Sequence, residues 1–163
     1  MNPGLTLGRI AGIRISIHWS WLVVFALISW TLADSAFLEQ NPGLSDSAYV
    51  AMALAASVVF FGSLLLHELG HALQARRERM EIDGITLWLF GGVATFRGDF
   101  PSALAELRVA LAGPLVTAGL VGCFALLAEL GLPEAADGVV TWLAVINVVL
   151  LVFNLLPALP LDG

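Results

Sequence analysis

Residues 48–71 read AYVAMALAASVVFFGSLLLHELGH, and this stretch determines how the rest of the chain is interpreted. Residues 48–66 carry no charged side chain, and about 20 apolar residues are enough for a helix to span a bilayer. The stretch ends on His67, Glu68 and His71. Residues i and i+4 share a helix face, so the histidines can bind one metal ion while Glu68 reaches its open side. The stretch predicts a metal site with hydrolytic chemistry inside a membrane-spanning helix.

The composition is that of a membrane protein. Of the 163 residues, 59% are hydrophobic and only 12% are charged. Besides residues 48–66, long runs without Asp, Glu, Lys or Arg cover residues 15–33, 109–128 and 138–161. We therefore expect an all-α polytopic membrane protein with about four transmembrane helices.

The basic residues predict the orientation of these helices. With a cytoplasmic N-terminus, four spans place every arginine inside and agree with the positive-inside rule. The net charge of −6 gives no indication of a nucleic-acid partner. A signal peptide is the alternative for residues 1–36, but the segment before the apolar run is long and contains glycine. The seven basic residues are Arg9, Arg14, Arg76, Arg77, Arg79, Arg97 and Arg108.

Two short segments have β-strand character. Residues 5–17 predict a short strand before the first helix, and residues 82–96 predict a hairpin that turns at Gly91-Gly92. The hairpin is too short for a helical span and too apolar to lie freely in water, so we expect it at the cytoplasmic membrane face, shielded by protein. Its residues 90–96 could offer a strand edge to a substrate. Shielding of the metal site is the alternative role.

A hydrolytic zinc site usually has three protein ligands, so the histidines need a partner. His71 and His67 precede Arg76 by roughly 7 Å and 14 Å along a helix, which puts the metal below the inner surface. Asp162 follows a proline-broken stretch at the inner end of the fourth span and reaches a plausible depth. Glu106 is an alternative, although a solvated carboxylate at a helix start suits it better.

Three segments together resemble the site-2 protease family of intramembrane zinc metalloproteases: residues 67–71 (HELGH), residues 90–94 (FGGVA) and residues 154–163 (NLLPALPLDG). The resemblance is to the compact branch without a PDZ insert. It implies that His67, His71 and Asp162 bind one Zn²⁺ per chain and that Glu68 is the general base. It also implies that Asn154 stabilises the oxyanion or positions substrate. An amide near a broken helix can instead satisfy loose carbonyl groups, which is the alternative role of Asn154.

Residues 112–117 (AGPLVT) also resemble a family segment, although many relatives have asparagine where Thr117 stands. Gly113 and Thr117, like Ala118 and Gly122, are small residues four positions apart. Such spacing allows close helix approach, so packing is the role expected of them.

We therefore expect a zinc-dependent intramembrane endopeptidase that cleaves transmembrane or membrane-proximal segments near the cytoplasmic face, as in regulated intramembrane proteolysis. Residues 1–163 should form a single transmembrane metalloprotease core, truncated at the C-terminus because relatives continue with further helices. The expected partners are a transmembrane protein substrate and the lipid bilayer of the cell membrane. The competing class is a non-catalytic metal-binding membrane scaffold or transporter component.

Overall fold

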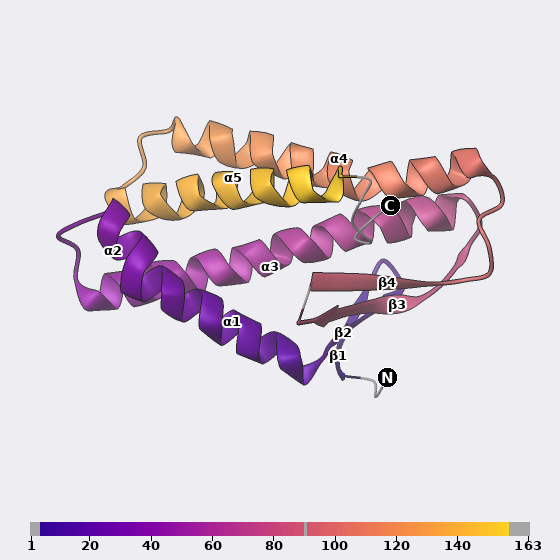
Figure 1. The fold of residues 1–163 in the computed structure, drawn as a ribbon, viewed down its shortest axis with the longest axis horizontal. Coiled ribbons are helices and arrows are strands. Elements are labelled where there is room, and N and C mark those ends of the chain that lie inside the picture. The colour runs from indigo at the N-terminus through magenta and orange to yellow at the C-terminus, as the bar shows by residue number, and fades with distance from the viewer. Residues whose placement is uncertain (1–3, 90, 157–163) are drawn as a thin grey trace.

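Four long apolar helices dominate the computed structural model, which describes residues 4–89 and 91–156. The first span covers Trp19–Gln40: α1 (Trp19–Thr31) continues through a π-helical turn, η1 (Leu32–Ala36), into α2 (Phe37–Gln40). The other spans are α3 (Asp46–Arg77), α4 (Ala103–Ala128) and α5 (Glu134–Asn154). All four are long and apolar enough to cross a membrane, so the predicted fold class is confirmed. Figure 1 shows α3, α4 and α5 lying side by side, with the strands gathered near one end of the bundle.

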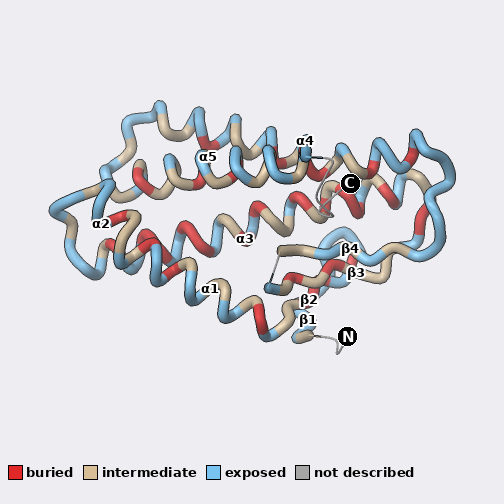
Figure 2. Tube along the Cα trace, in the orientation of Figure 1, coloured by how far each residue is buried: buried red, intermediate tan, exposed pale blue. Residues whose placement is uncertain are grey.

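The ends of the two central helices follow from local sequence. Ser45 caps α3 by accepting a hydrogen bond from the Ala48 amide, and Ser102 caps α4 by accepting one from the Ala105 amide. Leucines and valines on the outer helix surfaces stay exposed, as expected of side chains that face lipid, including Leu115 and Leu126 at 70% and 72% exposure. Buried positions recur along α3, which the other helices and the sheet surround (Figure 2).

The strands form one four-stranded sheet in the order β1-β2-β3-β4. β1 (Leu5–Ile10) and β2 (Ile13–Ile17) are antiparallel, as are β3 (Glu81–Trp88) and β4 (Gly91–Arg97), whereas β2 and β3 are parallel. The prediction of a single strand over residues 5–17 was wrong, because the segment is a hairpin. Its turn residues, Ala11 and Gly12, have φ values of 51° and 83°, which suit a tight two-residue turn.

The predicted hairpin over residues 82–96 exists, but its turn does not lie at Gly91-Gly92. β3 ends at Trp88, which pairs with Gly91, and Leu87 pairs with Gly92, so both glycines belong to β4. Gly91 has a φ of 130°, which favours glycine. A Cβ on Gly92 would lie 2.3 Å from Cγ of Glu68. The two glycines therefore serve backbone conformation and close packing.

One face of the sheet packs on the part of α3 that carries the two histidines. Ile13, Ile15 and Ile85 of the sheet form a buried cluster with Leu69 and Ala72 of α3. In an apolar membrane environment such a contact is stabilised by close van der Waals packing of the side chains. The sheet is thereby fixed beside the predicted metal ligands.

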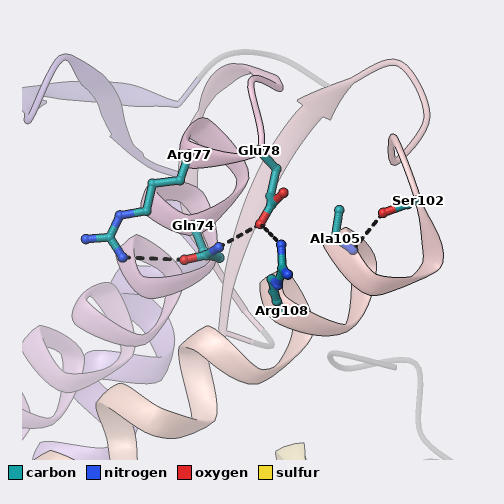
Figure 3. Close-up of polar contacts among 6 residues, drawn as sticks. All are labelled: Gln74, Arg77, Glu78, Ser102, Ala105 and Arg108. Carbon is teal, nitrogen blue, oxygen red and sulfur yellow. Dashed lines mark hydrogen bonds and ion pairs between the residues drawn. The ribbon is translucent and has the colours of Figure 1, made fainter.

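Polar contacts join the C-terminal end of α3 to the N-terminal end of α4 (Figure 3). Glu78 Oε1 accepts hydrogen bonds from Gln74 Nε2 at 2.9 Å and from Arg108 Nη1 at 3.3 Å. Arg77 donates to Gln74 Oε1 at 3.4 Å. This cluster lies one turn beyond His71 and helps to set the position of α3 along α4.

Replacing Arg108 with glutamine should lower the free energy of unfolding by less than about 1 kcal/mol, because exposed ion pairs are screened by solvent. The Arg108 side chain is 54% exposed and its Glu78 partner 17%. Thermal unfolding in detergent measures the effect. A loss of several kcal/mol would show that the ion pair contributes far more than its exposure suggests.

Candidate metal centre

His67 and His71 lie one turn apart on α3 and are buried, with 2% and 6% of their surface exposed. Their Nε2 atoms face each other at 3.0 Å. Tetrahedral zinc with Zn–N bonds of 2.0–2.1 Å would place two ligand nitrogens about 3.3 Å apart. The pair is therefore close to the separation that a shared zinc ion requires.

The other ring nitrogen of each histidine contacts α4. His71 Nδ1 lies 2.7 Å from the backbone carbonyl oxygen of Val109, and His67 Nδ1 lies 2.8 Å from Oγ1 of Thr117. A carbonyl oxygen can only accept, so His71 Nδ1 carries the hydrogen and Nε2 of the neutral ring presents a lone pair. This is the tautomer that binds a metal through Nε2.

Gly113 leaves room for both imidazole rings, which pack directly against it. A Cβ on Gly113 would lie 2.1 Å from His71 Nε2 and 2.7 Å from His67 Nε2. Gly70 brings the helices together, because a Cβ there would lie 2.8 Å from the carbonyl oxygen of Ala112. The two ring nitrogens and the tautomer of His71 fit a bound metal ion, and the glycines let the rings and helices approach closely enough to form the pair.

Glu68 follows His67 on α3 and is half-buried. Its carboxylate lies against β4: a Cβ on Gly92 would be 3.0 Å from Cδ and 3.1 Å from Oε1 of Glu68. The carboxylate is thus held between the helix that carries the histidines and the backbone of β4. A carboxylate in the turn that carries two metal-binding histidines is a candidate acid or base for hydrolysis.

Among the described residues, the two histidines have no further side chain beside them that would complete a three-ligand metal site. Within residues 4–89 and 91–156, no cluster of three His, Cys, Asp or Glu side chains is placed to hold a metal. Glu78 pairs with Arg108, while Glu81 and Asp83 pair with Arg97. Asp162, the ligand that the resemblance implies, lies outside the described residues, and so its role stays a prediction.

Asn154 is the last residue of α5 and is half-buried. α5 packs against both α3 and α4, so its C-terminal end returns toward the end of the bundle where the sheet lies (Figure 1). This placement is compatible with the predicted role of Asn154, which stays a prediction.

Thr117 is the site residue for which the sequence suggested packing alone. It is fully buried and contacts the predicted ligand His67. The backbone carbonyl of Val109 contacts the other predicted ligand, His71. The available signal was the spacing of Val109, Gly113 and Thr117, which stand four residues apart on one face of α4. By contrast, a Cβ on Gly122 would meet nothing within 4 Å among the described residues, so close helix packing does not require that glycine.

Comparisons with known proteins identify a protease family and several relatives. Residues 55–133 match the model of peptidase family M50. The chain is 39% identical over 167 residues to Rip3 of Mycobacterium tuberculosis, and 32% identical over 168 residues to zinc metalloprotease MJ0392 of Methanocaldococcus jannaschii. These alignments cover the whole chain but only 42% and 44% of the relatives, so the chain spans less than half of their length.

The fold is similar to that of a solved site-2 protease from Methanocaldococcus jannaschii. The TM-score is 0.64 at 28% sequence identity, and the match covers 98% of this chain and 67% of the solved one. Four helices among the described residues are long and apolar enough to span a membrane, and together with this structural match they make the chain a multi-pass membrane protein. The chain belongs to the site-2 protease family of membrane metalloproteases.

Proposed function

We propose that this chain is the core of a zinc-dependent intramembrane endopeptidase that cleaves transmembrane or membrane-proximal segments of proteins near the cytoplasmic face. The observation that carries the proposal is the convergence of His67 Nε2 and His71 Nε2 at Gly113, with Glu68, the residue after His67, packed against Gly92 of β4. The zinc metalloprotease MJ0392 and the solved site-2 protease support the reaction class.

His67 and His71 would hold one zinc ion per chain, with Asp162 as the third ligand. When bound, zinc polarises a substrate carbonyl and activates a water molecule for attack near neutral pH. The Glu68 carboxylate accepts the proton of that water and returns it to the departing amine. The side-chain amide of Asn154 donates a hydrogen bond to the negative charge that develops on the carbonyl oxygen.

The depth of the site points to cleavage inside the bilayer. The arginines of β1, β2, α3, β4 and α4 belong to the strands and helix ends at the end of the bundle where α3 ends (Figure 1), which supports a cytoplasmic N-terminus in the cell membrane. His71 and His67 precede Arg76 by about 7 Å and 14 Å of helix. A substrate bond cut at this depth belongs to a transmembrane or membrane-proximal segment.

The backbone of β4 is suited to hold such a substrate as an added strand. Leu87 O accepts a hydrogen bond from the His18 amide at 2.8 Å, so the backbone polar groups of Leu87 point toward β2. Leu87 pairs with Gly92, which must therefore direct its own N–H and C=O away from β3. The same applies to Ala94, two residues further along the strand. An unwound substrate can pair with this edge directly beside Glu68.

Replacing Ala94 with proline should slow cleavage about 10-fold, because it removes one outward N–H and thus one hydrogen bond to the substrate. The β3–β4 pairing should survive, since this N–H does not bond to β3. Zinc content should be unchanged. The rate is measured on a single-span reporter in proteoliposomes, with Ala94→Ser, which keeps the N–H, as the control. Equal rates for the proline and serine variants would contradict strand addition at β4.

The proposal as a whole is tested by zinc content and reporter cleavage in the same preparation of full-length protein. One equivalent of zinc together with cleavage that stops on chelation and returns with zinc supports it. One equivalent of zinc with no cleavage of any reporter would favour a non-catalytic scaffold.

A further inference from the structure

We propose that Thr117 is a positioning residue that holds His67 in the tautomer and orientation needed to bind the metal. This inference rests on the proposed zinc site, and it concerns a residue on α4 that is itself no ligand. Its basis is the 2.8 Å contact between Thr117 Oγ1 and His67 Nδ1, in which both residues are buried.

α4 contacts both histidines in the same way, one turn on either side of Gly113. The contact to His71 comes from the backbone carbonyl of Val109, which is present whatever the side chain at position 109. The contact to His67 comes from a side chain and depends on the residue at position 117. A substitution at position 117 can therefore remove a hydrogen bond to the metal-binding His67 and leave both histidines in place.

The chemistry requires an acceptor at this point. A neutral imidazole that binds metal through Nε2 carries its hydrogen on Nδ1, and this N–H must be satisfied in a buried site. The Thr117 hydroxyl lies within hydrogen-bond distance of Nδ1 and can accept this hydrogen. Valine has nearly the same shape but accepts nothing, so it would leave the buried N–H without this partner.

Thr117→Val should weaken zinc binding 10- to 100-fold, the usual effect of removing a group that orients a metal ligand. Thr117→Ser keeps the hydroxyl and should bind zinc within a few-fold of the wild type. Affinity is measured in full-length protein by competition with a chelator. The visible spectrum of the Co²⁺-loaded protein should change in the valine variant and return to the wild-type form in the serine variant.

The matched control is Ser57→Ala. Ser57 is also fully buried and accepts an interhelical hydrogen bond, from Ser29 at 2.8 Å, but it lies more than two turns from His67 on α3. This variant should bind zinc as the wild type does. If Thr117→Val does not fold, Thr117→Ala replaces it, with the same expected loss.

If the wild type binds zinc and Thr117→Val binds it equally tightly, the positioning role is overturned and the proposed function stays intact. An equal loss in Thr117→Val and Thr117→Ser would also overturn it, because the hydroxyl would not be the group that matters. A wild type that binds no zinc would overturn the metal site itself, and the positioning role with it.

Discussion

Replacing Glu68 with glutamine should reduce cleavage of a single-span reporter at least about 100-fold while zinc content stays at the wild-type level, because a general base typically contributes 10²–10⁴-fold. Glutamine has almost the same shape as glutamate, so the contact with Gly92 of β4 should persist. What it lacks is the negative charge that accepts the proton from water. The cleavage rate and zinc content are measured in the same proteoliposomes.

The control for Glu68→Gln is the same substitution at Glu78, near the end of the same helix. Glu78 contacts Gln74 and Arg108 at the surface, ten residues beyond Glu68. Glu78→Gln should leave cleavage within a few-fold of the wild type. Cleavage by Glu68→Gln at the wild-type rate would show that another group acts as the base.

Replacing Gly113 with alanine should abolish zinc binding, with a loss of affinity of at least about 100-fold, and should abolish cleavage with it. The added Cβ would lie 2.1 Å from His71 Nε2, far closer than two non-bonded heavy atoms can approach. It would also lie 2.7 Å from His67 Nε2, so both rings would have to turn away. Zinc is measured by mass spectrometry after gel filtration.

Gly119→Ala is the matched control on the same helix. A Cβ at Gly119 meets nothing within 4 Å among the described residues, so this variant should keep its zinc and its activity. One full equivalent of zinc in Gly113→Ala would contradict the close packing of both histidine rings against this position.

The helices and the histidine pair could be predicted from sequence because each depends on local properties. A run of about 20 uncharged residues has few alternatives to a membrane helix, and the i, i+4 spacing brings His67 and His71 together in any helix. Four spans and a small sheet are what the structure contains. The sheet order was not predictable, because the parallel pairing of β2 with β3 joins segments separated by the whole of α3.

The errors have physical causes as well. The sequence predicts a turn at Gly91-Gly92 because glycine pairs usually mark one. In the structure Gly92 is needed because the Glu68 side chain packs directly against its Cα, where a Cβ would clash. Thr117 looked like a packing residue because small residues at helix interfaces usually are. Its contact with His67 depends on how α4 is rotated against α3, which no single segment encodes.

The most direct test is the position at which the zinc-loaded, full-length protein cuts a single-span reporter in proteoliposomes, determined from the masses of the products. We predict a cut within the apolar segment, about 7–14 Å below the cytoplasmic surface, where His71 and His67 lie. An intact reporter, or a cut only in its water-exposed flanks, would contradict an intramembrane zinc protease built on His67, Glu68 and His71.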